Sequence, residues 1–183
     1  AMRALGVELS AAIKACQQLP PEPGRMQSLG GSQKPCVVID YAHTPDALMQ
    51  ALKALRPMTS AREGQLYCIF GCGGDRDPSK RAPMAKAAED DADVIVLTSD
   101  NPRSEQPQHI IAHMVDGLSD LSKAIICIDR AEAIAQTIEK AKPQDVILIA
   151  GKGHEDYQEI MGVKIPFSDE KQALAVLSLW GSA

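Results

Sequence analysis

The sequence predicts an α/β fold, a Rossmann-like doubly wound sheet that is mostly parallel and is followed by a C-terminal hairpin. Short apolar runs rich in β-branched residues recur along the chain, and helical patterns separate them. Runs that are apolar throughout are typical of strands buried on both faces, and crossover helices make neighbouring strands parallel. A length of 183 residues, 45% of them hydrophobic, is sufficient for one core of this kind.

The chain opens with a helix-forming segment from Glu8 to Leu19, which ends at the proline-rich stretch from Pro20 to Gly24 because no helix can cross it. A polar turn follows at residues 30–35. Five apolar runs then predict buried strands at residues 36–40, 66–70, 94–98, 124–128 and 146–150. Helical spacing of apolar residues predicts the intervening helices around residues 48–55, 83–89, 110–118 and 134–141.

The last segment of the chain predicts a hairpin and one more helix. Residues 157–161 and 163–167 have strand character and meet at Gly162. Ser168 precedes two acidic residues, which is typical of a helix start, and we expect this helix to run to Leu179. The hairpin and the helix therefore follow the parallel strands rather than interrupt them.

Charge and composition argue against several classes of protein. A formal net charge of −5 provides no broad cationic field, which disfavours nucleic acid or an anionic membrane as the main partner. No apolar run approaches the ~20 residues of a membrane span, and the first residues lack the apolar core of a signal peptide. Five cysteines without a CxxC pair fit a reducing compartment, so we expect a cytoplasmic protein. His109 and His113 share a helical face without a third ligand nearby, and we expect no metal site there.

Four loops that directly follow predicted strands combine turn-forming residues with charged ones, at residues 40–45, 71–77, 99–103 and 151–155. Ligands of parallel sheets bind beyond the carboxyl ends of the strands, so these loops are the first place to search. Any one of them alone is equally well explained as a solvated turn. Together they bring acidic, amide and guanidinium groups to one crevice, which suits a small zwitterionic ligand. These groups belong to Arg76, Asp100, Asn101, Arg103 and Glu155.

Two of the loops match phosphate-binding motifs only in part. The stretch from Gly71 to Gly74 follows a strand, but Arg76 stands where the dinucleotide fingerprint has its third glycine. The stretch from Gly151 to Gly153 lacks the hydroxyl residue and the earlier glycine of a P-loop. The sequence therefore contains no complete nucleotide cradle, and a dinucleotide oxidoreductase is disfavoured. Cys72 in the first of these loops is a candidate reactive thiol.

Five stretches together resemble the C-terminal domain of the Mur ligases, and within that family the branch that adds meso-diaminopimelate. They are GRM at 24–26, DYAHTPDAL at 40–48, FGCGGDRD at 70–77, DNPR at 100–103 and AGKGHEDYQ at 150–158. They occur in the family's order and extend over most of the chain from Gly24 onward. The resemblance implies that residues 24–183 are this C-terminal domain and that residues 1–23 are a remnant of the family's central ATP-binding domain with its linker.

The resemblance implies an ATP-dependent ligase of peptidoglycan synthesis that joins meso-diaminopimelate to UDP-N-acetylmuramoyl-L-alanyl-D-glutamate. In the family, ATP phosphorylates the substrate carboxylate and the amine attacks the acyl phosphate, because a free carboxylate is too poor an electrophile. The resemblance assigns one set of residues to meso-diaminopimelate: Arg76, Asp100, Asn101, Pro102, Arg103, Gly151 and Glu155. It assigns a second set to the nucleotide: Arg25, Asp40, Tyr41 and His43.

Within the first set, Arg103 can hold the distal carboxylate of diaminopimelate in a bidentate fork, and Glu155 suits the distal ammonium. L-Lysine lacks that carboxylate, so the resemblance favours diaminopimelate as the amino acid. Lys80 and Arg81 precede Ala82 and Pro83, where the family often has KRP, and this leaves the start of the predicted helix open.

The resemblance also implies what this chain lacks. The family carries its P-loop and its magnesium ligands in the central domain and its UDP-sugar contacts in an N-terminal domain. We therefore expect the 183-residue chain to bind ATP and Mg²⁺ incompletely, to contain no catalytic residue of its own and to be inactive alone. We also expect it to be monomeric. A hinge is expected near Pro20 to Gly24. The alternative is a non-catalytic α/β module that binds an amino acid or a nucleotide.

Overall fold

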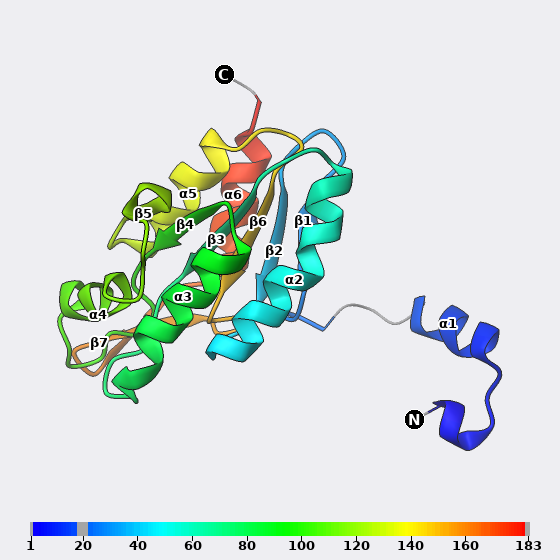
Figure 1. Cartoon of the computed structure of the whole chain (residues 1–183), viewed down its shortest axis with the longest axis horizontal. Helices are drawn as coiled ribbons and strands as arrows, with labels where there is room; N and C mark the ends of the chain where they lie inside the picture. Colours follow the sequence, from blue (N-terminus) through cyan, green and yellow to red (C-terminus); the bar gives the residue numbers. More distant parts are fainter. Residues whose placement is uncertain (1, 18–21, 182–183) are drawn as a thin grey trace.

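The computed structural model describes residues 2–17 and 22–181, and its centre is a six-stranded sheet with the strand order β1-β2-β6-β3-β4-β5 (Figure 1). The neighbours from β2 to β5 in this order pair in parallel, whereas the edge strand β1 runs antiparallel to β2. A separate antiparallel hairpin is formed by β7 and β8. The predicted fold, a mostly parallel doubly wound sheet with a C-terminal hairpin, is confirmed.

The secondary structure alternates between strands and helices as far as β6. The strands of the main sheet are β1 (Gln27–Gly30), β2 (Cys36–Asp40), β3 (Leu66–Phe70), β4 (Val94–Leu97), β5 (Ala124–Ile126) and β6 (Val146–Ala150), and those of the hairpin are β7 (Tyr157–Ile160) and β8 (Val163–Pro166). The α-helices are α1 (Leu9–Gln17), α2 (Pro45–Ala61), α3 (Arg81–Asp91), α4 (Pro107–Val115), α5 (Arg130–Lys140) and α6 (Asp169–Leu179). Short 3-10 helices are η1 (Met2–Leu5), η2 (Pro78–Lys80) and η3 (Leu121–Lys123).

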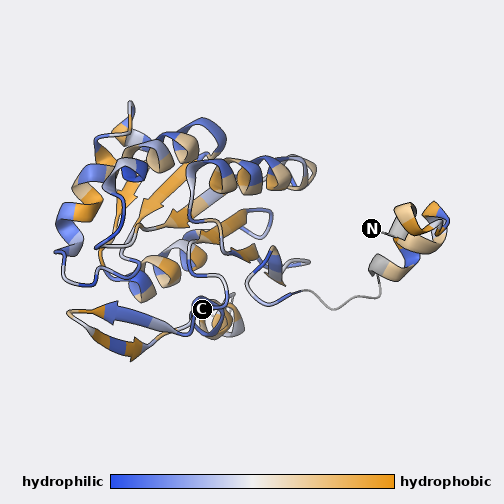
Figure 2. Ribbon diagram, turned by 90° about the horizontal axis from the view of Figure 1, so that it is seen from below, coloured by the Kyte–Doolittle hydropathy of each residue, from blue (hydrophilic) through white to orange (hydrophobic). Residues whose placement is uncertain are grey.

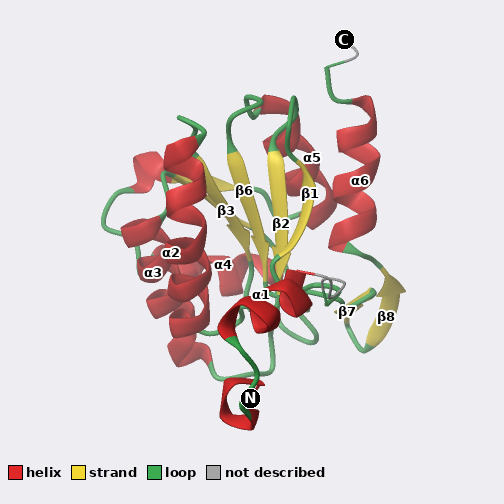
Figure 3. Cartoon of the chain, turned by 90° about the vertical axis from the view of Figure 1, so that its right-hand side faces the viewer, coloured by secondary structure: helices red, strands yellow, loops and turns green. Residues whose placement is uncertain are grey.

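Helices cover both faces of the sheet. On one face, α3 packs between α2 and α4, and on the other face α5 packs against α6 (Figure 3). Successive residues of a strand point to opposite faces, so each buried strand contributes to two cores. Val38 and Cys68 belong to the core under α2 and α3, whereas Val37 and Ile69 belong to the core under α5 and α6.

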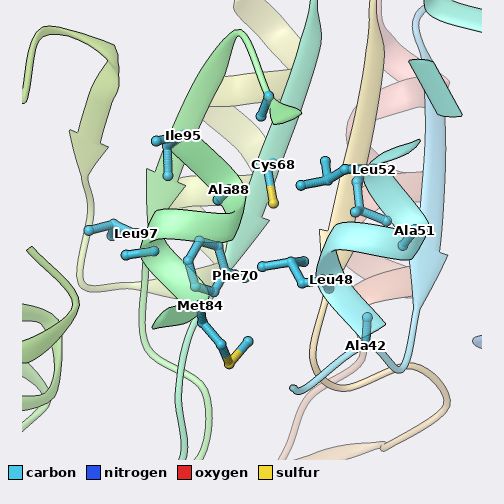
Figure 4. Close-up of a cluster of buried hydrophobic side chains, with 14 of the residues drawn as sticks. Ala42, Leu48, Ala51, Leu52, Cys68, Phe70, Met84, Ala88, Ile95 and Leu97 are labelled. Carbon is cyan, nitrogen blue, oxygen red and sulfur yellow. The ribbon is translucent and has the colours of Figure 1, made fainter. Parts of the chain in front are cut away.

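Aliphatic side chains make up most of the first core, together with several that contain sulfur and the aromatic ring of Phe70. Figure 4 shows Leu48 and Leu52 of α2 directed toward Phe70 and the other side chains of the sheet, with Met84 of α3 beside them. Each fully buried side chain of this size contributes about 1.5–3 kcal/mol relative to an exposed one. The strands of the main sheet are correspondingly hydrophobic along their length, whereas the hairpin alternates between hydrophilic and hydrophobic residues (Figure 2).

All five predicted parallel strands are present, and the hairpin and the last helix lie where the sequence predicts them. β5 ends at Ile126, two residues early, so Cys127 lies just past the strand. α3 begins at Arg81 instead of Pro83, because η2 leads directly into it and a proline is tolerated in the first turn of a helix. α4 ends at Val115, three residues before the predicted end.

Strand β1 was not predicted from the sequence. Its four residues, QSLG, are mostly polar and alternate between half-buried and exposed, so they carry no strong strand signal. The strand forms because it pairs with β2, with Leu29 opposite Val37. Whether such a short edge strand forms is determined by its tertiary contacts and not by its local propensity.

At the N-terminus, α1 lies within the predicted helix from Glu8 to Leu19 and packs against η1. The predicted boundary and hinge from Pro20 to Gly24 fall partly outside the described residues. Across residues 2–17 and 22–181, no helix combines the length and the apolar character needed to cross a membrane.

Candidate functional site

The four loops selected from the sequence follow four strands that are neighbours in the sheet, in the order β2, β6, β3 and β4. Because these strands are parallel, their following loops gather at one edge. The hairpin joins them there, since Arg103 bridges to Ile160 of β7. The N–H of Arg103 donates to the carbonyl of Glu159 at 2.9 Å, and its carbonyl accepts from the N–H of Met161 at 2.7 Å. The predicted residues therefore share one edge of the sheet with the hairpin.

Arg25, Tyr41, His43 and His154 form an aromatic and cationic cluster at this edge. The guanidinium carbon of Arg25 lies 5.5 Å from the centre of the Tyr41 ring. The ring of His43 meets Tyr41 edge-on at 4.7 Å, and the ring of His154 stacks on it at 5.9 Å. Three members of the cluster were predicted as nucleotide contacts, and His154 is an addition. Flat rings beside a guanidinium can stack on a base and pair with a phosphate.

Asp40 holds the backbone next to this cluster. Its Oδ2 accepts the N–H of Met26 at 2.9 Å, and its Oδ1 accepts the N–H of Ala42 at 2.8 Å. Gly24 has a φ of +68°, and a Cβ there would collide with the backbone of residues 153–154. The segment that carries Arg25 thus packs directly on the loop after β6. The predicted role of Asp40 in nucleotide binding stays a prediction, because both of its oxygens already accept backbone N–H groups.

Lys152 is the centre of a second cluster, and its side chain has no solvent exposure. Its ammonium donates to Oδ1 of Asn101 at 2.9 Å and to the carbonyl of Tyr157 at 2.8 Å. Oδ1 of Asp100 lies 3.0 Å and Oε2 of Glu155 lies 3.6 Å from the same nitrogen. A buried ammonium requires such partners, because an uncompensated charge in the interior is strongly destabilising. Lys152 therefore joins three of the residues predicted to bind the amino acid.

Asn101 links this cluster to the hairpin. Its Nδ2 donates to Oε2 of Glu155 at 3.0 Å, and its Oδ1 also accepts the N–H of Glu159 at 3.0 Å. Glu155 retains a side-chain exposure of 24%, and its Oε1 has no hydrogen bond within the described part of the chain. Glu155 is thus oriented from one side and open to a cationic ligand from the other.

Arg103 is held in a left-handed backbone conformation, with a φ of +52°. Its Nη1 donates to the carbonyl of Gly74 at 2.8 Å, and its Nε pairs with Oε2 of Glu159 at 3.2 Å. A Cβ on Gly73 would lie only 3.0 Å from Nη1, so a glycine at this position leaves room for the guanidinium. Among the residues that the structure describes, Nη2 of Arg103 binds none, and it can donate to a carboxylate.

The other predicted residues lie in the same loops. Gly151 has a φ of +112°, and a Cβ there would lie 3.2 Å from Oδ2 of Asp100, so the glycine permits this close approach. Pro102 is buried, and its carbonyl accepts the N–H of Glu105 at 3.0 Å. Arg76 is exposed, and its guanidinium reaches only the carbonyl of the preceding residue, at 3.4 Å, within residues 22–181. Arg76 can contact a ligand but is not held in place.

Two further carboxylates tie the loop after β3 to the loop after β4. Oδ1 of Asp75 accepts the hydroxyl of Ser104 at 2.6 Å, and this bond holds the pKa of Asp75 below its usual value. Glu105 pairs with the buried Arg81 at 2.7 Å, and hydrogen bonding to this guanidinium lowers the pKa of Glu105. Both carboxylates are therefore ionised at neutral pH, and the two loops form one unit.

Lys152, His154 and Glu159 take part in these clusters and were not assigned to the site from the sequence. A lysine between two glycines, directly after a buried strand, is a signal that could have indicated a buried ammonium. The position of Glu159 opposite Arg103 has no such signal, because it depends on how the hairpin returns to the sheet.

Cys72 is not a reactive thiol. It is buried with its sulfur 3.7 Å from that of Met84, and burial raises its pKa to about 12, so the thiolate is scarce at neutral pH. The four cysteines whose side chains are described are free thiols. His113 lies 3.0 Å from a guanidinium nitrogen of Arg81. No group of three or more metal-ligating side chains occurs in the described ranges.

A cavity of about 680 Å³ lies near the cluster around Lys152, between β5, α5 and β7. It is lined in part by Ser99, Arg130, Gln158 and Ile160. No residue of the two predicted sets lines it. The predicted amino-acid site is therefore distinct from this cavity.

The fold and the two clusters define an α/β domain whose charged and aromatic side chains gather at the carboxyl ends of its parallel strands. The family profile for the Mur ligase, glutamate ligase domain, matches residues 24–153, and the chain belongs to this family.

Curated relatives extend the match over nearly the whole chain. A UDP-N-acetylmuramoyl-L-alanyl-D-glutamate--2,6-diaminopimelate ligase of Acidovorax sp. is 52% identical over 180 residues, which are 98% of this chain and 36% of the relative. The ligase of the same name from Pseudomonas aeruginosa is also 52% identical over 180 residues. The chain thus spans about a third of the length of the curated relatives that it matches.

Solved structures agree with this family. A structure of a ligase of the same name has a TM-score of 0.78 and 44% sequence identity, and the alignment covers 96% of this chain and 36% of that one. A bifunctional folylpolyglutamate synthase/dihydrofolate synthase from Yersinia pestis has a TM-score of 0.59 at 21% identity and shares the fold.

Proposed function

We propose that this chain is the C-terminal, amino-acid-binding domain of an ATP-dependent ligase that adds meso-diaminopimelate to UDP-N-acetylmuramoyl-L-alanyl-D-glutamate in peptidoglycan synthesis. One observation carries the proposal: Arg103 lies in the same loop as Asp100 and Asn101, and Lys152 ties that loop to Glu155. The names and the identity of the curated relatives support the same reaction.

The charges of Arg103 and of the cluster around Lys152 match the distal end of meso-diaminopimelate, which carries one carboxylate and one ammonium. Nη2 of Arg103 can donate to the carboxylate. Asp100 and Glu155 bring two negative charges and Lys152 one positive charge, so this cluster retains one negative charge for the ammonium. L-Lysine offers the ammonium without the carboxylate, and Arg103 would remain without its ligand.

The same edge supplies part of a nucleotide site. The rings of Tyr41, His43 and His154 can stack on a base, and Arg25 beside them can pair with a phosphate. The sequence has no P-loop, and the described residues offer no carboxylate cluster for Mg²⁺. This part of the chain therefore fits the base and one phosphate of ATP and does not fit the metal.

In the proposed reaction, ATP converts a substrate carboxylate into an acyl phosphate. The contribution of this chain is to bind the amino acid in a fixed orientation, so that its nucleophilic amine is presented to that electrophile. Alone, the chain would bind the amino acid without catalysing the reaction. The alternative function is that of a non-catalytic α/β module that binds an amino acid or a nucleotide. A cytoplasmic location and a monomeric state stay predictions.

The test is a titration of the 183-residue chain with meso-diaminopimelate and with L-lysine, followed by amide chemical shifts in NMR. We expect meso-diaminopimelate to shift the resonances of the DNPR loop and of the loop after β6, and to bind at least tenfold more tightly than L-lysine. Equal affinity for the two amino acids, or shifts at another edge of the sheet, would contradict the proposed function.

A further inference from the structure

Glu159 is the third residue of β7, and its side chain faces Arg103. Its Oε2 lies 3.2 Å from Nε of Arg103, with side-chain exposures of 26% for Glu159 and 18% for Arg103. The main chain of Glu159 has a separate task, because its carbonyl accepts the N–H of Arg103 and its N–H donates to Asn101. The carboxylate of Glu159 is therefore not needed to attach the hairpin to the DNPR loop.

The contacts of Arg103 leave a defined part of its guanidinium for a ligand. Nε is occupied by Glu159 and Nη1 donates to the carbonyl of Gly74. Nη2 has no hydrogen bond within the described chain, and Nη1 has a second N–H. A carboxylate can therefore bind the end of the guanidinium while Glu159 keeps its place at Nε.

A ligand carboxylate bound in this way would share one positive charge with Glu159. Two carboxylates at one guanidinium repel each other in a half-buried site, where solvent screens them incompletely. A ligand that carries an ammonium on the same carbon as the carboxylate removes this repulsion, because its end has no net charge. A ligand that ends in a carboxylate alone does not.

We propose that Glu159 is a specificity-determining residue that rejects ligands with a bare distal carboxylate and admits those whose distal end is a zwitterionic amino-acid centre. The inference rests on the proposed function, because it assumes that Arg103 binds the distal carboxylate. Arg103 would select for the carboxylate, and Glu159 would require the ammonium next to it.

The experiment compares meso-diaminopimelate with 2-aminopimelate, which has the same carbon chain and both carboxylates but lacks the distal ammonium. The wild-type chain and Glu159→Gln are titrated with each ligand by NMR. We expect Glu159→Gln to bind 2-aminopimelate about fivefold more tightly than wild type does, while its affinity for meso-diaminopimelate changes less than about twofold.

Asp156→Asn is the matched control. Asp156 lies three residues before Glu159, is exposed, and its side chain makes no hydrogen bond or ion pair in the described structure. The substitution removes one negative charge from the loop just before β7, and we expect the ratio of the affinities for 2-aminopimelate and meso-diaminopimelate to equal that of wild type. Glu159→Ala is a second test variant, since it also keeps the backbone bonds of β7, and it should show the same gain for 2-aminopimelate.

The outcomes separate this inference from the proposed function. If wild type binds meso-diaminopimelate better than L-lysine, but neither Glu159 variant gains affinity for 2-aminopimelate, then only the role of Glu159 is wrong. A loss of affinity for meso-diaminopimelate without that gain would also overturn it and would make Glu159 a direct ligand of the ammonium. If the wild-type chain does not bind meso-diaminopimelate more tightly than L-lysine, the proposed function is wrong, and the inference about Glu159 is wrong with it.

Discussion

The ammonium of Lys152 lies 2.9 Å from Oδ1 of Asn101, and the lysine side chain is completely buried. Replacing Lys152 by Met would remove the donor and leave the nearby carboxylate of Asp100 without its counter-ion. We expect Lys152→Met to lower the free energy of unfolding by about 2–4 kcal/mol, measured by urea denaturation. Lys53→Met, at an exposed position of α2, is the control and should change it by less than about 0.5 kcal/mol. Equal stabilities of the two variants would show that the cluster is not a stabilising one.

Arg103 is expected to determine affinity for the amino acid. Arg103→Ala removes the guanidinium that the proposed site directs at the distal carboxylate. We expect a loss of about 1–3 kcal/mol in the binding of meso-diaminopimelate, measured by the same titration. Arg25→Ala is the control, because Arg25 lies in the other cluster and should leave this affinity unchanged. Unchanged binding by Arg103→Ala would remove the role assigned to this residue.

Gly24 is expected to control the position of Arg25. Its φ of +68° strains any other residue, and an added Cβ would collide with the backbone of residues 153–154. We therefore expect Gly24→Ala to displace the segment that carries Arg25 and to shift the amide resonances of Tyr41 and His154. Gly162→Ala is a suitable control, since its φ is +76° but its Cβ would meet nothing within 4 Å. Local shifts confined to residue 24 would contradict this packing.

Most of the fold could be predicted because each buried strand has its own signal in the sequence, a short run of apolar residues. Runs such as Val146–Ala150 are apolar throughout, and only a sheet covered on both faces buries every residue of them. Strand β1 has no apolar run of this kind, and it forms only because it pairs with β2. The strand order was also beyond sequence reasoning, because parallel strands joined by helices can be arranged in more than one order, and here β6 lies between β2 and β3.

The candidate site was predicted as a set of loops, and its internal pairing was not. Asp100, Asn101 and Glu155 were identified because charged residues follow predicted strands. The partners of Lys152 could not be predicted, because they come from the loop after β4, the loop after β6 and the start of β7, which meet only in the folded chain. The glycines on either side of Lys152 were a signal of its burial only. Glu159 was overlooked for a similar reason, because only the folded hairpin brings it to Arg103.

The buried pair of Arg130 and Asp169 is expected to stabilise the edge that carries the site. Nε and Nη2 of Arg130 each lie 2.8 Å from an oxygen of Asp169, and neither side chain is exposed. Nη2 also donates to the carbonyl of Ala150 at 2.9 Å, at the end of β6. We expect Asp169→Asn to lower the free energy of unfolding by about 3–5 kcal/mol, because it leaves a buried guanidinium without its counter-ion.

A double-mutant cycle checks this pair. Arg130→Met combined with Asp169→Leu removes both charges, and we expect the double variant to be more stable than either single one in urea denaturation. Additive losses from the two substitutions would show that the two charges do not stabilise each other.

Because of Glu89, we expect the stability of the folded chain to change with pH in the acidic range. Its Oε1 accepts the N–H groups of Ser119 and Asp120, each at 2.7 Å, and its Oε2 pairs with Lys86 at 2.9 Å. The bond from Asp120, followed by that from Lys86, lowers the pKa of Glu89 from an ordinary value of 4.5 to about 2. The carboxylate therefore stays ionised in the folded chain at pH values where it is protonated in the unfolded chain.

A carboxyl whose pKa is lower in the folded state contributes its full stabilisation above the unfolded pKa of 4.5 and loses it as the pH falls toward the folded pKa of about 2. We therefore expect Glu89→Gln to unfold at a lower temperature than wild type at pH 7, with a difference that stays constant down to about pH 5 and shrinks between about pH 4.5 and pH 2. Thermal unfolding of both proteins across this range measures it. Glu139→Gln, at an exposed position of α5, should match wild type at every pH. A wild-type advantage over Glu89→Gln that persists unchanged at pH 2 would mean that the stabilisation by Glu89 does not depend on its ionised carboxylate.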